Sequence, residues 1–223
     1  MRTKALFLTV ALSAAGIATS MAQVYSVNAV GYVNQTIPHG YSMVANPFVT
    51  QTNTLNALLP PASMPANLTL FKFGPGGYTI SIVDEFDVAW VSNMVPNGDT
   101  ETIVFGDGVF LLNPAAAFTL TWVGEVATGN PVINPLVTGY QIKSSKIPQA
   151  GLVTTDLGYP PLPGDTLFKF NTASQMYDVY IFDDFDLIWV KNAVPNEPSL
   201  GIAESAFFLR SAGGSWNRNF TVN

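Results

Sequence analysis

Residues 84–97 read DEFDVAWVSNMVPN, and residues 183–196 read DDFDLIWVKNAVPN. Nine of the fourteen aligned positions are identical. An acidic group, a tryptophan and a Pro-Asn turn therefore recur in the same order within one chain of 223 residues. Self-similarity at a fixed spacing is the mark of an internal duplication, so we expect two copies of one folding unit.

The segments around this stretch also recur, and their patterns predict strands. TLFKF occurs at 69–73 and again at 166–170, and GDGVFLLN at 106–113 matches AESAFFLR at 203–210. Tyr78, Ile80 and Ile82 alternate with Thr79 and Ser81, and Tyr177, Val179 and Ile181 repeat this spacing, which is the period of a strand. Pro and Gly punctuate the intervals between these runs. We predict an all-β fold, a tandem duplication of a five- to six-stranded antiparallel β-sandwich or barrel unit.

The order of segments along the chain predicts export. Arg2 and Lys4 precede an apolar run, and small residues flank Met21, so residues 1–22 are interpreted as a signal peptide. The apolar run is shorter than the roughly 20 residues that span a bilayer, and no second long run follows. We therefore predict no membrane span and a periplasmic or extracellular location.

The mature chain is divided into two repeats. Repeat 1, with an N-terminal strand, is expected at 23–126 and repeat 2 at 127–223, and residues 129–137, with two Asn-Pro pairs, are interpreted as the connector. Val30–Val33 resembles Val123–Val126. Each repeat is thus expected to begin with a strand that the preceding segment supplies.

Composition argues against several classes of function. The net charge is −6 and becomes more negative once Arg2 and Lys4 are removed, which disfavours binding to nucleic acid or to anionic membranes. There is no cysteine, and the single histidine, His39, would have to carry any Ser-His triad without a Gly-x-Ser-x-Gly motif. We predict that the protein is not an enzyme and needs no cofactor.

The acidic clusters are the candidate metal site. Three carboxylates lie within four residues in each copy, and hard cations such as Ca²⁺ prefer oxygen ligands. The other interpretation is a turn whose Asp side chains accept bonds from backbone N–H groups. A glycosidase acid pair including Asp87 and Asp186 is a third. The candidate ligands are Asp84, Glu85, Asp87, Asp183, Asp184 and Asp186.

The four tryptophans can be interpreted as core residues or as sugar-stacking platforms. Trp90 aligns with Trp189, Trp122 with Phe220, and Trp216 with Phe118. An aromatic residue in both copies favours a core role. In that case Trp90→Ala should cost about 3–5 kcal/mol of stability.

Several motifs together resemble a known group of proteins. They are VYSVNAVGYVN at 24–34, GYSMVANPF at 40–48, the TLFKF and GDGVFLLNP strands, and the closing FTVN. With them the chain resembles uncharacterised exported two-repeat all-β proteins of verrucomicrobial-type bacteria. The resemblance implies the fold and export, and carries no catalytic residues.

We therefore expect an exported, non-catalytic structural or adhesion protein of the cell envelope or extracellular space. Self-association would use open strand edges or the segment Val24–Val33 as a donated strand. A glycan-binding module that uses exposed Tyr and Trp is the alternative, and an acidic-pair glycoside hydrolase is a more distant one.

Overall fold

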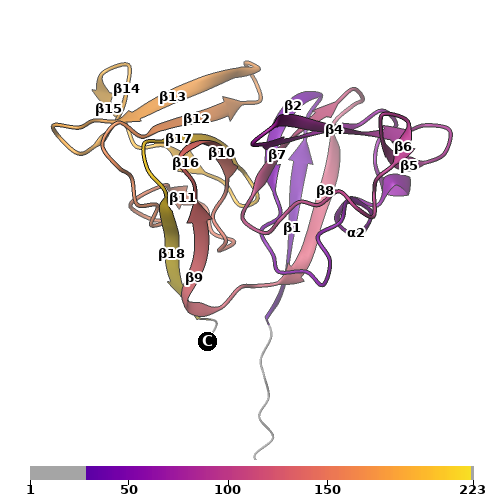
Figure 1. The fold of residues 1–223 in the computed structure, drawn as a ribbon, viewed down its shortest axis with the longest axis horizontal. Coiled ribbons are helices and arrows are strands. Elements are labelled where there is room, and N and C mark those ends of the chain that lie inside the picture. The colour runs from indigo at the N-terminus through magenta and orange to yellow at the C-terminus, as the bar shows by residue number, and fades with distance from the viewer. Residues whose placement is uncertain (1–28, 222–223) are drawn as a thin grey trace, which may run out of the picture.

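The computed structural model describes residues 29–221 (Figure 1). The predicted signal peptide at 1–22 and residues 24–28 of the predicted donor segment lie outside this range. The first half holds β1 (Val30–Ile37), β2 (Gly40–Ala45), α2 (Leu55–Leu58), the 3-10 turn η1 (Pro61–Ser63), β3 (Thr69–Gly74), β4 (Gly77–Asp84), β5 (Ala89–Ser92), β6 (Val95–Pro96), β7 (Gly108–Asn113) and β8 (Phe118–Glu125). The second half holds β9 (Gly129–Leu136), β10 (Gly139–Lys143), β11 (Gly151–Leu152), β12 (Thr166–Asn171), β13 (Met176–Phe182), β14 (Trp189–Lys191), β15 (Val194–Pro195), β16 (Ser199–Leu200), β17 (Ala206–Arg210) and β18 (Gly214–Phe220).

Both halves have the same topology. A six-stranded antiparallel sheet has the order β2-β7-β3-β4-β5-β6 in the first half and β10-β17-β12-β13-β14-β15 in the second. A two-stranded sheet lies beside each, β1-β8 and β9-β18, and the second half adds the short pair β11-β16. The predicted all-β fold with two similar units is therefore confirmed.

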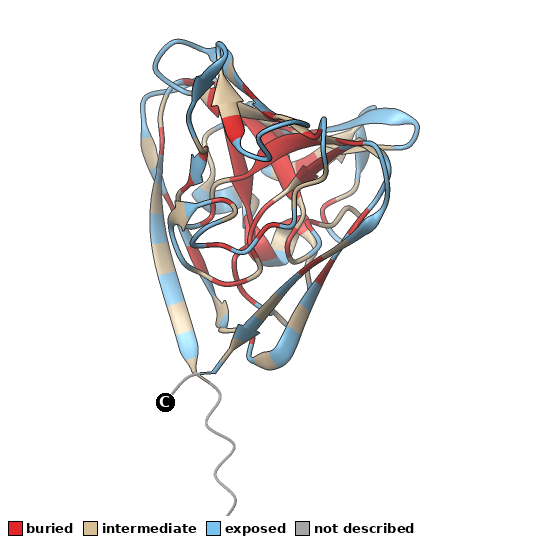
Figure 2. Ribbon diagram, turned by 90° about the vertical axis from the view of Figure 1, so that its left-hand side faces the viewer, coloured by how far each residue is buried: buried red, intermediate tan, exposed pale blue. Residues whose placement is uncertain are grey.

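Each half has its own core between its large sheet and its strand pair. Figure 2, in which one half lies in front of the other, shows the buried segments in the interior of the molecule. In the first half the core includes Ile37 and Trp122 from the strand pair and Leu70 and Trp90 from the sheet. In the second half Leu136 and Trp216 face Leu167 and Trp189 in the same way. This arrangement follows from the period of two, which sends alternate side chains of every strand to the interior.

A third core joins the two large sheets. Met43 and Phe110 of the first sheet pack with Ile142, Phe170 and Phe207 of the second. The adjoining strand edges are bonded to the opposite half by two equivalent hydrogen bonds. Ala45 N–H donates to the Ala203 carbonyl at 2.9 Å, and Ser144 N–H donates to the Gly106 carbonyl at 3.0 Å. The halves are thus related by an approximate two-fold rotation.

Gly108 stands at a close contact between the halves. A Cβ atom at this position would lie 2.3 Å from Ser205 and 2.5 Å from Ile142. Only a glycine lets the edges meet here, whereas Ser205 occupies the equivalent place in the second half.

Two sequence-based expectations about segment boundaries are wrong. Residues 129–137 are not a connector, because Gly129–Leu136 is strand β9 and pairs with β18. Val30–Val33 is not the counterpart of Val123–Val126; it pairs with Trp122–Glu125 across the β1-β8 ladder. Each half therefore begins with a strand that pairs with the last strand of that same half. In the described part of the chain, no helix is long and apolar enough to cross a membrane.

Candidate binding surfaces

The acidic loops are built as backbone turns. Asp84 Oδ1 accepts the N–H of Phe86 at 2.9 Å and that of Asp87 at 2.8 Å. Asp183 Oδ1 accepts the equivalent N–H groups of Phe185 and Asp186, each at 2.9 Å. These bonds, from Asp186 first and then Phe185, lower the pKa of Asp183. The first Asp of each cluster therefore has a structural role, and this role explains why it recurs in both copies.

The remaining carboxylates of the clusters do not gather. Glu85 Oε2 accepts the side-chain amide of Asn67 at 3.2 Å. Among residues 29–221, no group of three or more His, Cys, Asp or Glu side chains is placed to hold a metal ion. Calcium binding at these loops stays a prediction for experiment. The loops lie at opposite ends of the molecule, beyond β4 and β13 in Figure 1, so Asp87 and Asp186 do not form a pair with each other.

All four tryptophans are core residues, as the repeat pattern predicts. Each is at most 3% exposed. Each indole N–H has a partner: Trp90 donates to the Leu59 carbonyl at 2.8 Å, and Trp189 donates to the Thr154 hydroxyl at 2.8 Å. A buried indole with a satisfied N–H cannot serve as a platform for a sugar ring.

The alignment of the last strands was wrong by two residues. Ile37 faces Phe118 and Leu136 faces Gly214, so the equivalent of Gly214 is Phe118. Trp216 therefore takes the place of Leu120, and the place of Trp122 is taken by Arg218. A shift of two residues keeps each side chain on the same face of the strand, which is why the core pattern survived the error.

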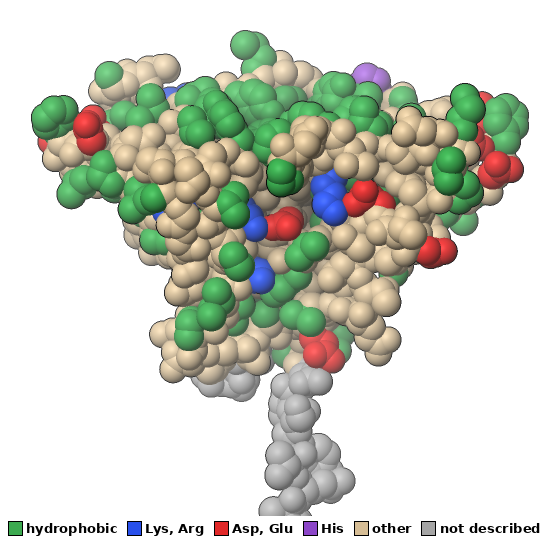
Figure 3. All heavy atoms as spheres, in the orientation of Figure 1, with side chains coloured by type: hydrophobic (Ala, Val, Ile, Leu, Met, Phe, Trp, Pro, Cys, Tyr) green, Lys and Arg blue, Asp and Glu red, His purple; other side chains and the backbone are tan. Residues whose placement is uncertain are grey.

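The outer faces of the two large sheets form one apolar surface, which we call the aromatic face and which includes the buried third core at the junction of the halves. It faces away from the two-stranded sheets, and Figure 3 shows hydrophobic side chains gathered over the sheets along the top of the molecule. Strand register places eleven equivalent positions on each sheet, none of them charged, with Thr69 and Thr166 as the polar exceptions. The other members are Tyr41, Met43, Phe71, Phe73, Tyr78, Ile80, Ile82, Val91, Phe110 and Leu112 in the first half, and Tyr140, Ile142, Phe168, Phe170, Tyr177, Val179, Ile181, Val190, Phe207 and Leu209 in the second.

Ring contacts connect the two sheets across this surface. Phe73 lies 5.2 Å from Phe207, and the equivalent pair of Phe170 and Phe110 lies 5.5 Å apart, both edge to face. Burial raises the pKa of Tyr177 to about 12, and the neighbouring Tyr78 adds to this effect. The aromatic rings of the two sheets are therefore in direct contact across the junction between the halves.

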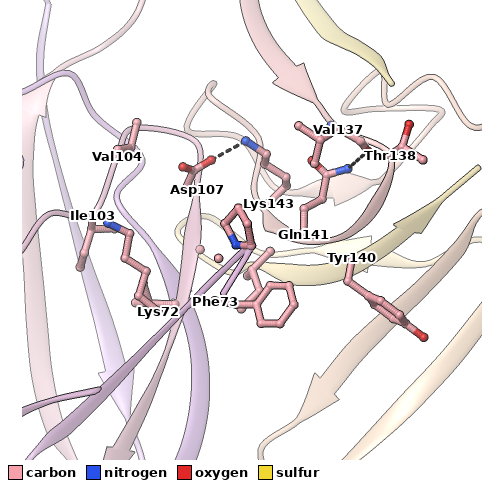
Figure 4. A pocket seen from close by; sticks show the side chains of 15 residues that line it. Lys72, Phe73, Ile103, Val104, Asp107, Val137, Thr138, Tyr140, Gln141 and Lys143 are labelled. Atoms are coloured by element: carbon pink, nitrogen blue, oxygen red, sulfur yellow. Dashed lines mark hydrogen bonds and ion pairs between the residues drawn. The ribbon is translucent and has the colours of Figure 1, made fainter. Parts of the chain in front are cut away.

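A pocket of about 560 Å³ opens beside the aromatic face, at one side of the junction between the halves. Figure 4 shows Phe73, Val137 and Tyr140 around it. Its two lysines are both engaged, since Lys72 forms an ion pair with Glu101 at 2.8 Å and Lys143 is bonded to Asp107. The pocket is thus mainly apolar, with its charges neutralised at the rim.

A buried polar cluster in the second half was not predicted from the sequence. Arg210 is 3% exposed and Asp165 1%. Arg210 Nη1 lies 3.3 Å from Asp165 Oδ2 and donates to the Tyr159 hydroxyl at 2.7 Å. Burial, followed by the Asp165 charge, raises the pKa of Tyr159. In the sequence, this cluster was indicated only by the replacement of Asn113 in the first copy by Arg210 in the second. The cluster connects the loop that carries Tyr159 and Asp165 to β17.

Searches with protein-family models, among curated proteins and among solved structures found no significant match to the chain.

Proposed function

We propose that this chain is an exported, non-catalytic structural or adhesion protein that assembles with other copies of itself through the aromatic face. The observation that carries the proposal is the exposure of that face. Eight of its aromatic and aliphatic side chains are between 38% and 53% exposed. At about 150–250 Å² for each large side chain, these eight together expose on the order of 500–900 Å².

This area lies at or above the upper end of the apolar patches on ordinary monomers and approaches one side of a protein interface. The largest apolar patch of a typical monomer covers about 300–600 Å². One side of a standard protein interface covers about 800 Å². Exposed apolar patches at the upper end of this range mark interaction surfaces, which supports a partner that covers the aromatic face.

The shape and charge of the aromatic face favour a second copy as that partner. It is uncharged, so it offers nothing to attract an oppositely charged surface. It carries approximate two-fold symmetry, and an isologous dimer buries the same patch on both subunits. Two sheet faces of alternating side chains can stack about 10 Å apart, as in a β-sandwich.

The strand edges are less suited to this role. β6 and β15 are two residues long and include Pro96 and Pro195, which cannot donate a ladder hydrogen bond. The free edges of β2 and β10 are bonded to the opposite half at Ala45 and Ser144, so neither is open along its whole length. Val30–Val33, the described part of the predicted donor segment, is already paired with β8.

The test is the oligomeric state by sedimentation velocity and light scattering over a range of concentrations. The double variant Ile80→Lys/Val179→Lys places a charge at equivalent central positions of the two sheets. The control Val123→Lys/Ile133→Lys changes exposed aliphatic residues of β8 and β9, away from the face. We expect the wild type and the control to associate and the face variant to be monomeric.

A monomeric wild type at all concentrations, or equal association of the face variant and the control, would refute this function. Export is tested separately, by the mass of the secreted chain, which should begin at Gln23.

Glycan binding is the second candidate, and it is supported by the four tyrosines of the aromatic face. Tyr41, Tyr78, Tyr140 and Tyr177 are between 40% and 53% exposed. A glycan array that gives a hit with the wild type, and none with Tyr78→Ala/Tyr177→Ala, would favour this function over assembly.

A further inference from the structure

The junction between the halves has two equivalent corners, and a side chain fills only one of them. At the first corner the β12–β13 turn of the second half reaches the edge of β2. Gln175 Oε1 accepts the Tyr41 N–H at 2.7 Å, and Gln175 Nε2 donates to the Tyr41 carbonyl at 3.1 Å. One primary carboxamide thus satisfies both backbone groups of one residue on a strand edge.

The second corner has the same edge without the glutamine. In β2 the backbone groups of Tyr41, Met43 and Ala45 point away from the neighbouring strand β7. Gln175, Ser205 and Ala203 of the second half bond to these groups. Directly after β10, the N–H of Ser144 points away from β17 in the same way, because it donates to the Gly106 carbonyl. Since backbone groups of a strand alternate in direction, Tyr140 presents its N–H and carbonyl outward, as Tyr41 does.

The reason for the difference is the length of the turn that faces each corner. In the second half four residues, Thr172–Gln175, connect β12 to β13. In the first half Pro75 and Gly76 alone connect β3 to β4 and carry no long side chain. A Cβ at Gly40 would lie 2.7 Å from Gln175 Oε1, whereas a Cβ at the equivalent Gly139 would meet no atom within 4 Å.

The open corner is the pocket described above. Gly74, Pro75, Thr138 and Tyr140 are among its lining residues, so it lies between the short turn and the β10 edge (Figure 4). Its volume of about 560 Å³ lies within the range of about 300–1,000 Å³ that small-ligand pockets occupy. Its apolar walls surround a strand edge whose Tyr140 N–H and carbonyl have no protein partner within residues 29–221.

We propose that this pocket binds a glutamine side chain, carried on a turn of a partner protein, through the backbone of Tyr140. The chemistry is that of the filled corner, and it recurs nearby. Gln141 Oε1 accepts the Val137 N–H at 3.0 Å, and Gln141 Nε2 donates to the Val137 carbonyl at 2.8 Å. A primary carboxamide is the side-chain group that offers an acceptor and a donor side by side.

This geometry predicts which side chains the pocket rejects. A glutamate accepts the Tyr140 N–H but places a second charged oxygen against the Tyr140 carbonyl, with no proton to donate. A buried backbone carbonyl left without a donor is costly, so the pocket should discriminate strongly between glutamine and glutamate. The partner is therefore distinguished by its amide and not by its charge.

The experiment titrates ¹⁵N-labelled protein with the peptide NTASQM, acetylated and amidated, which copies residues 171–176 of this chain. We expect saturable shifts of the Gly139–Ile142 amides, and binding at least tenfold weaker when the peptide glutamine is replaced by glutamate. Thr138→Trp, which fills the mouth of the pocket, should abolish the shifts.

Gln175→Ala supplies the matched control, because it exposes the equivalent corner. In this variant the same peptide should also shift the amides of Gly40 and Tyr41. Absence of shifts at Tyr140, or equal affinity for the glutamine and glutamate peptides, would overturn the proposal. Both titrations are carried out with the Ile80→Lys/Val179→Lys variant as well, so their outcome does not depend on self-assembly.

Discussion

Replacement of Trp90 tests whether the residues that define the repeat serve the core. Trp90 is fully buried, and its indole N–H donates to the carbonyl of Leu59, which is itself fully buried. Trp90→Ala leaves a cavity that costs about 3–5 kcal/mol. It also strands the Leu59 carbonyl, at a further cost of about 1–3 kcal/mol. The total is comparable with the stability of a typical domain, about 5–15 kcal/mol, so this variant should be largely unfolded in its first half.

Conservative replacements separate the two contributions. Trp90→Phe keeps an aromatic ring in the core but still strands the Leu59 carbonyl. Trp189→Phe makes the same change in the second half, where the lost partner is the hydroxyl of Thr154, a half-buried residue that water can reach. We therefore expect Trp90→Phe to be more destabilising than Trp189→Phe by about 1 kcal/mol.

The measurement is urea denaturation followed by far-UV circular dichroism, with midpoints and slopes compared among wild type, the alanine variant and the two phenylalanine variants. A loss of less than about 1 kcal/mol for Trp90→Ala would contradict the core role of the repeated tryptophan. Equal losses for the two phenylalanine variants would contradict the argument from the Leu59 carbonyl.

Three further predictions concern charge and pH. Asp165→Asn should lower stability by about 3–5 kcal/mol, because it leaves the buried Arg210 charge without its counter-ion, and adding Arg210→Met should restore part of the loss in a thermal melt. Because burial raises the pKa of Tyr177 to about 12, the stability that its neutral form contributes is complete below its unfolded pKa of about 10 and is lost as pH rises toward 12. Absorbance at 295 nm should show late tyrosine ionisation, and Tyr177→Phe should reduce its amplitude by one tyrosine. Calcium binding by the loops of Asp84 and Asp183 predicts a higher melting temperature in millimolar Ca²⁺ than with a chelator, and identical melting curves would eliminate that site.

The local pattern of the chain was sufficient for the strands and for the buried tryptophans. Alternation over 78–82 and 177–181 identified β4 and β13, and the recurrence of Trp90 at Trp189 identified a core position in each half. Both inferences depend on the alternation of side chains along a single strand, which neighbouring residues determine. The roles of Asp84 and Asp183 as turn residues were among the alternatives for the same reason, since their partners lie two and three residues away.

Pairing partners were harder to predict. The Asn-Pro pairs of β9 led to its interpretation as a linker, although it pairs with β18. The similarity of Val30–Val33 to Val123–Val126 suggested equivalent strands, whereas the two segments belong to the paired strands β1 and β8. Strand register depends on which strands pair, and the paired strands β1-β8 and β9-β18 are far apart in the chain. The residues of one strand do not identify its partner. The buried pair of Asp165 and Arg210 was missed on the same ground.

By itself the sequence determined a duplicated all-β chain whose acidic turns and tryptophans recur, because periodicity and turn chemistry are local. Only the tertiary structure decided that both large sheets turn their aromatic faces the same way, and that one corner between them is closed by Gln175 while the other is open. Those features depend on how two similar halves pack against each other, and the energy of that packing comes from residues far apart in the chain, such as Phe73 and Phe207.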